Sequence, residues 1–289
     1  MARQKMISQD VNKYLAPKYR LVARFTNSKV ITQVVYSTLK GDKVLAQATS
    51  QELKKFGLTT GLTNYSASYA TGLLLARRVL STLKLDKTFQ GNKKIDGNDY
   101  DVSAAQAGDR RPFTCILDIG IIRPTIGNRV FGVLKGATDG GLHVPHSVRK
   151  FPGYSKDKDT KKDTYEAETH RDRIFGSHID EYMQKLKSES QEAYNRQFSQ
   201  WDKCLTENKV KSVEELMEKV FEGIKKDFAF VKKGKKIYKP KFIDEKKTQV
   251  QSGKNVYRRF AKIGLEERKR RVQEKIKIAK DQIKMLAGN

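Results

Sequence analysis

The stretch YRLVARFTNSKVITQVVYST, residues 19–38, decides the fold. Apolar and basic side chains alternate over Tyr19–Thr26, which is the period of a β-strand with one buried face. Asn27-Ser28 is a tight-turn pair, and the β-branched run Val30–Thr38 follows it, so the stretch predicts a hairpin. A third run, Val44–Ser50, comes after a second turn and extends the hairpin to an antiparallel meander.

A long helix is expected after the meander. Thr63 or Asn64 is a favourable N-cap residue. Apolar side chains then recur at alternating spacings of four and three residues, so one face of the helix should cover the sheet. The members of this stripe are Tyr69, Leu73, Ala76, Leu80 and Leu83.

The next segment predicts a loop, a strand and a second helix. Residues 86–112 are polar and rich in glycine, which is typical of a long surface loop. The short apolar run Phe113–Ile119 favours a buried central strand. Gly127–Gly140 is expected to be helical, with Gly140-Gly141 as its stop. Its inward side chains should be Val130, Phe131, Leu134 and Ala137. Strands followed by helix, strand and helix predict the α/β class, a mixed sheet with packed helices.

The C-terminal half predicts an extended segment, more helices and a tail. His143–Tyr165 is rich in proline, glycine and lysine and is expected to be extended. Helices are expected at 166–187, 189–201 and 212–228. The last has the clearest stripe: Val213, Leu216, Met217, Val220, Phe221 and Ile224. A terminal helix should align Leu265, Val272, Ile276, Ala279, Ile283 and Leu286. We expect three parts, an α/β core at 1–165, a helical extension at 166–231 and a basic tail at 232–289.

The charge of the chain is concentrated at its two ends. The 289 residues include 59 Lys+Arg and 33 Asp+Glu, a net charge of +26. Residues 232–289 hold 20 basic and 6 acidic side chains, and the first 30 residues hold seven and one. This one-signed bias is typical of a folded core with basic extensions that bind a polyanion. Solvated charge without a partner is the alternative.

Several classes of protein are not indicated. There is no apolar run long enough to span a membrane and no apolar leader at the N-terminus. The two cysteines favour a reduced compartment, and we expect a cytoplasmic protein. Nucleotide-binding glycine motifs are absent, and the four histidines lack the spacing of a zinc site. Asp118 has no partner acids that the sequence identifies, so we interpret it as structural. We expect no enzyme, cofactor or metal.

Cations and aromatic residues alternate in three stretches. They are His146–Tyr154, Tyr238–Phe242 and Tyr257–Phe260. Guanidinium and aromatic planes stack on unpaired bases, and basic side chains contact phosphate. Smaller basic clusters are expected at the first hairpin turn and around the helix start at Gly127, where free N–H groups favour a phosphate. No compact DNA-reading motif is present, so structured RNA is the favoured polyanion.

Several segments of the chain form residue-specific blocks. The first block is Gly61–Tyr65 with Tyr69–Arg78, and the second is Gly127–Gly132, Lys135–Leu142, Pro145–Ser147 and Phe151–Tyr154. A third is Lys13-Tyr14, Pro17–Arg20 and Thr26-Asn27, and Gln197–Gln200 is a weaker fourth. With these blocks the chain resembles a known family, the eukaryotic 5S-rRNA-binding protein of the large ribosomal subunit. The resemblance covers nearly the whole chain, and its first two blocks are long and residue-specific.

The resemblance implies a structural, non-enzymatic protein. Such a protein binds 5S rRNA, joins a second 5S-associated ribosomal protein and docks in the central protuberance, beside large-subunit rRNA and other central-protuberance proteins. It works on cytoplasmic ribosomes and is in the nucleus and nucleolus during assembly, with no membrane or small-molecule substrate. A non-ribosomal RNA-binding module or an assembly factor is the alternative. Family members begin with a further basic arm, which here is either lost or lies before an internal methionine.

Candidate RNA contacts come partly from the family motifs and partly from the basic and aromatic stretches. They are Arg20, Arg24, Asn27, Lys29, Asn64, Tyr65, Arg123, Asn128, Arg129, Lys135, His146, Arg149, Lys150, Phe151, Tyr154, Tyr238, Lys241, Tyr257, Arg258 and Arg259.

Overall fold

The computed structural model describes residues 17–38, 40–103, 110–156, 163–230, 241–242, 249–252, 255–258 and 263–287. Residue contacts divide the chain into two units, Met1–Phe230 and Val231–Asn289. The finer division into three parts stays a prediction. Within the described residues, no helix is long and apolar enough to cross a membrane.

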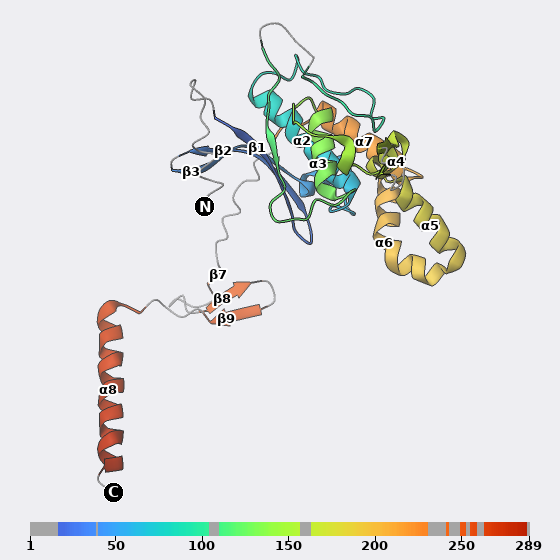
Figure 1. Ribbon diagram of the computed structural model, residues 1–289. Coiled ribbons are helices and arrows are strands. Elements are labelled where there is room, and N and C mark those ends of the chain that lie inside the picture. Colours follow the sequence, from blue (N-terminus) through green and yellow to red (C-terminus); the bar gives the residue numbers. More distant parts are fainter. Residues whose placement is uncertain are drawn as a thin grey trace. The chain divides into compact units, whose positions relative to one another are not determined.

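A mixed four-stranded sheet forms one layer of the first unit (Figure 1). Its strands are β1 (Tyr19–Phe25), β2 (Val30–Thr38), β3 (Gly41–Thr49) and β4 (Ile116–Asp118). The first three form the expected antiparallel meander, and β4 pairs parallel to β1, so the order is β3-β2-β1-β4. Leu21 and Ala23 point to the same side of β1 and are completely buried, as the alternation predicted.

The expectation of a buried central strand over Phe113–Ile119 is wrong. Strand β4 has three residues, lies at the sheet edge and pairs with β1 alone. Ile116 is 45% exposed, whereas Cys115 is buried just before the strand. A short apolar run indicates burial of part of a segment, but it does not tell a central strand from an edge strand.

Two helices pack on the sheet and on each other. Helix α2 (Tyr65–Thr82) contacts β2, β3, α3 and α7, and helix α3 (Arg129–Asp139) runs against it. Because α2 is covered on several sides, every residue from Tyr65 to Leu80 is buried, far more than the single expected stripe. The predicted inward side chains of α3 are buried too, and Gly141 ends this helix with φ +102°.

Glycines bring the backbones of α2 and α3 into contact. A Cβ atom on Gly72 would lie 2.3 Å from the carbonyl oxygen of Val133. A Cβ on Gly136 would lie 2.0 Å from the carbonyl oxygen of Tyr69. Both distances are shorter than any non-bonded contact between carbon and oxygen. Only glycine at these two positions therefore allows the helices to cross this closely.

The segment 86–112 has no helix or named strand among its described residues, as expected of a loop. It is nevertheless anchored in the protein, because Phe89 and Val102 are buried and the N–H of Asn92 donates to the carbonyl of Asp139 at 2.7 Å. The expected surface loop is therefore partly a core segment.

The rest of the first unit is mainly helical. Its helices are α4 (Ala167–Phe175), α5 (Ser177–Glu189), α6 (Gln191–Asn208) and α7 (Val213–Lys226), with short 3₁₀ helices η1 (Ser50–Phe56) and η2 (Val148–Lys150). The helix expected at 166–187 is two helices, because Gly176 adopts φ +86° between them. Helices α5 and α6 lie side by side and project from the unit (Figure 1). All six members of the α7 stripe are buried, as predicted.

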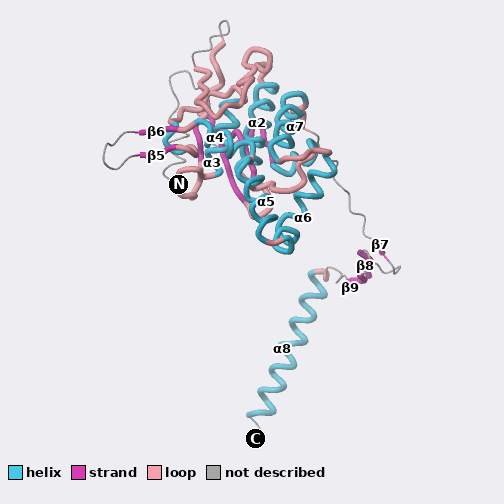
Figure 2. Tube along the Cα trace, turned by 90° about the vertical axis from the view of Figure 1, so that its right-hand side faces the viewer, coloured by secondary structure: helices cyan, strands magenta, loops and turns pink. Residues whose placement is uncertain are grey.

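The segment expected to be extended contains a small hairpin. Strands β5 (Tyr154–Lys156) and β6 (Asp163–Tyr165) pair antiparallel and lie at one side of the unit (Figure 2). The hairpin carries the aromatic side chains of Tyr154 and Tyr165 opposite each other in the register.

The described residues of the second unit form a small sheet and the expected terminal helix. The sheet has strands β7 (Lys241–Phe242), β8 (Gln249–Ser252) and β9 (Asn255–Arg258), none of them predicted. Helix α8 covers Leu265–Ala287, and members of its predicted stripe, Leu265, Val272, Ile276 and Ile283 among them, are exposed.

Candidate nucleic-acid interface

The start of α3 brings several predicted contacts together. Asn128 is its N-cap: the side-chain oxygen accepts from the N–H of Val130 at 3.2 Å, and the amide nitrogen donates to the carbonyl of Arg123 at 3.1 Å. The Asn128 side chain is thus engaged within the protein. The side chains of Arg123 and Arg129, on either side of it, are exposed.

Arg129 connects this helix start to two other elements. Its Nη1 donates to the carbonyl of Thr63 at 2.9 Å, just before α2. Its guanidinium lies 4.9 Å from the ring centre of Phe25, at the end of β1. The starts of α2 and α3 and the first hairpin therefore form one continuous surface.

The first hairpin turn leaves Asn27 exposed, and hydrogen bonds between Thr26 and Lys29 close the turn. The N–H of Thr26 donates to the carbonyl of Lys29 at 2.9 Å, and the N–H of Lys29 donates back to the Thr26 hydroxyl at 3.2 Å. Asn27 is exposed and Lys29 is partly exposed. Both remain accessible to a ligand.

Asp118 forms ion pairs with two arginines that the sequence predicts as RNA contacts, Arg20 and Arg24. Arg20 donates to it at 2.8 Å and also to Asp42, and the Arg20 side chain is only 15% exposed. Arg24 donates to the Asp118 carboxylate and carbonyl, both at 2.9 Å. Burial alone would raise the pKa of Asp118, but the hydrogen bonds from Arg24 and the Gly120 N–H outweigh it and lower the pKa. Arg20 is a structural residue, and Arg24 is partly so.

Lys135 does not lie on an exposed surface, so its burial gives no support to its assignment as an RNA contact, which stays a prediction. Its side chain is completely buried, 2.7 Å from Asp139, and also donates to the carbonyl of Asn98. Tyr69 donates to the other oxygen of Asp139 at 2.8 Å. Burial raises the pKa of Asp139, against the attraction of Lys135. The contact of Lys135 with the Asn98 carbonyl connects the segment 86–112 to helix α3.

The side chains of Tyr65 and Phe151 are buried around His170, so neither lies on an exposed surface, although Tyr65 also lines the smaller pocket described below. Their assignment as RNA contacts stays a prediction. The Tyr65 hydroxyl is 2.8 Å from one imidazole nitrogen, and the Tyr165 hydroxyl is 2.7 Å from the other. The Phe151 ring stacks on the imidazole at 4.7 Å. Burial, and secondarily the charge of Lys135, lower the pKa of His170 to about 3. The imidazole is neutral at physiological pH, and its two nitrogens join α2, α4 and β6.

The remaining predicted residues of the first unit lie near the surface. Tyr154 donates to Asp163 at 2.8 Å, and Arg149 lies 3.3 Å from the same carboxylate. His146 contacts the carbonyl of Val144 at 2.7 Å and lies 3.1 Å from Asp99. Lys150 is exposed, and Asn64, the N-cap residue of α2, is half-buried with no side-chain capping bond.

The tail candidates fall in or beside the small sheet. Lys241 is in β7, and Tyr257 and Arg258 are in β9, opposite Val250 and Gln249 of β8. Tyr238 and Arg259 lie outside the described residues.

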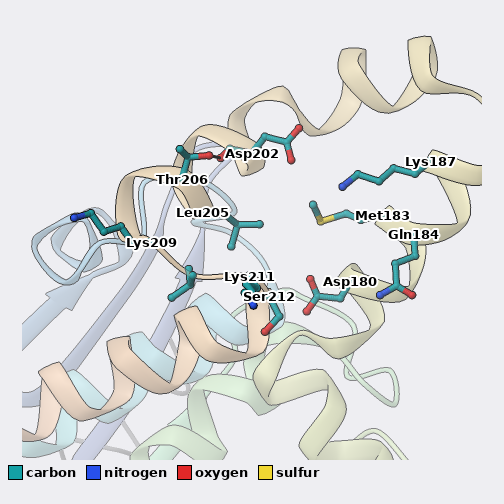
Figure 3. A pocket seen from close by; sticks show the side chains of 11 residues that line it. Asp180, Met183, Gln184, Lys187, Asp202, Leu205, Thr206, Lys209, Lys211 and Ser212 are labelled. Carbon is teal, nitrogen blue, oxygen red and sulfur yellow. Dashed lines mark hydrogen bonds between the residues drawn. The ribbon is translucent and has the colours of Figure 1, made fainter.

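Sequence reasoning did not identify two pockets that lie among the described residues of the first unit. The larger one, about 510 Å³, lies between α5, α6 and the turn before α7 (Figure 3). Asp180 and Asp202 line it, and both carboxylates are occupied: Asp180 accepts from the N–H of Val213 at 3.0 Å, and Asp202 accepts from the Tyr194 hydroxyl. Lys187, Lys209 and Lys211 line the same pocket, so its wall carries charges of both signs.

The smaller pocket, about 400 Å³, lies beside the start of α3 and includes Ile126, Pro152, Arg173 and His178. Its walls come from four segments of the chain that are distant in sequence, Tyr65 of α2 among them, so no local motif indicates it. Within the described residues, no group of three or more His, Cys, Asp or Glu side chains could hold a metal ion.

An exposed basic surface on an α/β core is typical of a nucleic-acid-binding protein. A family model described as ribosomal large subunit proteins 60S L5 and 50S L18 matches residues 1–147, and one for the ribosomal L18 C-terminal region matches residues 213–281. The chain belongs to this family of large-subunit ribosomal proteins, which are structural and non-enzymatic.

Curated relatives extend the match over most of the chain. The large ribosomal subunit protein uL18 of Tetrahymena thermophila is 53% identical over 241 residues, 83% of this chain and 80% of the relative. The protein of the same name from Eimeria tenella is 46% identical over 284 residues, 98% of this chain and 89% of the relative. That of Theileria annulata is 50% identical over 277 residues, 96% and 88%. RNA binding, a place on the ribosome and a role in translation follow from membership.

Proposed function

We propose that this chain binds 5S rRNA and anchors it in the central protuberance of the large subunit. The observation that carries the proposal is the position of Arg129, which joins the starts of α2 and α3 to the first hairpin through Thr63 and Phe25. Exposed Arg123 and Arg129 lie on this joined surface. We call the side chains of Asn27, Lys29, Arg123, Arg129 and Lys150 the basic face.

The mechanism is electrostatic attraction to a rigid platform. Each cation that contacts a phosphate releases a condensed counterion, so binding is strong at low salt and weakens as salt rises. The ion pair of Lys135 with Asp139 and the hydrogen bonds of His170 fix the helices beneath the basic face. A platform that is already ordered loses little conformational entropy when RNA binds.

The tail and further partners complete the proposal. The strongly basic residues 232–289 extend along 5S rRNA or neighbouring large-subunit rRNA. A second 5S-associated ribosomal protein joins the particle, which forms in the nucleus and nucleolus before it works in the cytoplasm. The family resemblance supports these partners and places.

Binding of the full chain to isolated 5S rRNA tests the proposal. If about six to eight phosphates are neutralised, log K should fall with log[salt] at a slope of several units. The double variant Arg123→Gln, Lys150→Gln should weaken binding, and the control Lys203→Gln, Arg196→Gln on α6, which removes the same charge, should not. A slope near zero, or equal affinities of the two double variants, would contradict the proposal.

Association with the ribosome is a separate measurement. The protein should stay with large subunits that have been washed in high salt and should dissociate when 5S rRNA is removed. Retention on subunits that lack 5S rRNA would overturn the anchoring role.

A further inference from the structure

The pocket beside the start of α3 has an apolar slot. Ile126, on the loop before the helix, is 51% exposed, and Pro152 faces the same space. Gly127 lies between them with φ +75°, and a Cβ atom built on it would meet only the Pro152 ring, at 4.0 Å. The space next to Gly127 is therefore open.

The other side of the pocket carries positive charge. Arg173, near the end of α4, has an exposed side chain, while its carbonyl accepts from the Ser66 hydroxyl at 3.1 Å. His178 of α5 lies beside it, and burial, followed by the charge of Arg173, lowers the pKa of this histidine. A neutral imidazole can donate and accept hydrogen bonds at a base edge. Thr169 also lines the pocket, and its hydroxyl donates to Glu166 at 3.1 Å.

The contrast with the pocket of Figure 3 indicates what the smaller pocket accepts. The wall of the larger pocket combines Asp180 and Asp202 with three lysines, whereas the lining of the smaller one includes the cation Arg173 and no carboxylate. Charge complementarity therefore favours an anion with an apolar, planar part. Its volume is at the lower end of the range for small-molecule sites, which suits one nucleotide.

We propose that this pocket takes one unpaired nucleotide of the bound RNA. Its base lies between Ile126 and Pro152, and its phosphate contacts Arg173. Unpaired bases that leave the stack are recognised by apolar and guanidinium surfaces combined with hydrogen bonds to the base edge. The proposal rests on the proposed function, because Arg123 and Arg129, which belong to the basic face, flank the loop that carries Ile126.

Two matched pairs of variants test the pocket with full-length protein and 5S rRNA. Arg173→Gln should weaken binding about tenfold and lower the salt slope by about one unit. Its control is Arg196→Gln, an arginine on α6 that is also exposed, and this variant should bind like wild type. Ile126→Ser should weaken binding with an unchanged salt slope. Its control is Ile121→Ser, since Ile121 is in the same loop, fully exposed and outside the pocket lining.

Chemical probing of the RNA bases supplies a second readout. Wild-type protein should protect one unpaired base that becomes reactive with Arg173→Gln and with Ile126→Ser, but not with either control. Thermal midpoints should match wild type, because both altered side chains are exposed.

The outcomes separate the two proposals. If wild-type protein does not bind 5S rRNA, the proposed function fails. If wild type binds, but the pocket variants match their controls in affinity and in the bases protected, the pocket proposal is overturned and the proposed function stands.

Discussion

Lys135 and Asp139 form an ion pair inside the protein, one helical turn apart, with side chains that are 0% and 1% exposed. A charge this deeply buried is tolerated only when it is paired and hydrogen-bonded. Here the second carboxylate oxygen accepts from Tyr69, and the ammonium also donates to the carbonyl of Asn98. The pair therefore connects α3 with α2 and with the loop before β4.

Removing the lysine should destabilise the protein without touching the RNA interface. Lys135→Met leaves the Asp139 charge buried and unpaired, which costs about 3–5 kcal/mol. Urea unfolding should show this loss, while Lys54→Met, at an exposed lysine of η1, should leave the midpoint unchanged. If the Lys135→Met protein has normal stability but binds 5S rRNA poorly, Lys135 takes part in RNA binding and this prediction is wrong.

Acid should weaken the fold through His170. Its pKa is about 3 in the folded protein against an ordinary value of 6.5, so the unfolded chain takes up the proton first as pH falls. The stabilisation is complete above pH 6.5 and is lost progressively toward pH 3. Between pH 7 and pH 5 this histidine should remove about 2 kcal/mol of unfolding free energy.

The variant His170→Gln isolates this contribution, because the other titrating groups stay the same. Urea unfolding at both pH values should show a smaller acid loss for the variant than for wild type. Equal losses in the two proteins would mean that His170 is not the group responsible.

Arg24 and Lys29 lie on the same hairpin but should respond differently to substitution. Arg24→Gln removes the contacts to Asp118 and should cost about 1 kcal/mol, since the arginine side chain is 43% exposed. Lys29→Gln should leave stability unchanged and weaken 5S rRNA binding. Unfolding and binding measured on both variants check this division, and a destabilised Lys29→Gln would count against it.

The crossing of α2 and α3 should not tolerate a methyl group. Gly136→Ala forces a carbon within 2.0 Å of the Tyr69 carbonyl oxygen and should cost about 1–3 kcal/mol or more. Gly264→Ala is the control, because a Cβ there meets no atom within 4 Å. Thermal unfolding of the two variants compares them directly, and an unchanged midpoint for Gly136→Ala would show that the helices can move apart.

Local pattern was sufficient for much of the fold. The alternation in Tyr19–Thr26 and the stripe of α7 each predict an element that the structure contains. These signals work because strand and helix periods depend on residues that are near one another in sequence. The edge position of β4 depends on pairing with β1, nearly a hundred residues away in sequence, and has no local signal.

The candidate interface was harder to predict, for the same physical reason. Arg123 and Lys150 are exposed as expected, but Lys135, Tyr65 and Phe151 are buried. Composition suggests that a lysine or tyrosine is available to a ligand, whereas its real environment is set by partners such as Asp139 and His170. The residues of the smaller pocket come from four segments that only the folded chain brings together.

The backbone contact between α2 and α3 has a consequence for how this protein can vary. Gly72 and Gly136 face carbonyl oxygens of the opposite helix, so no neighbouring side chain can shrink to make room for a larger residue at either position. A methyl group at one position would separate the helices and remove the reason for glycine at the other. Among natural variants the two positions should therefore keep glycine jointly or lose it jointly, and their loss should coincide with a shift of Arg129 away from Phe25.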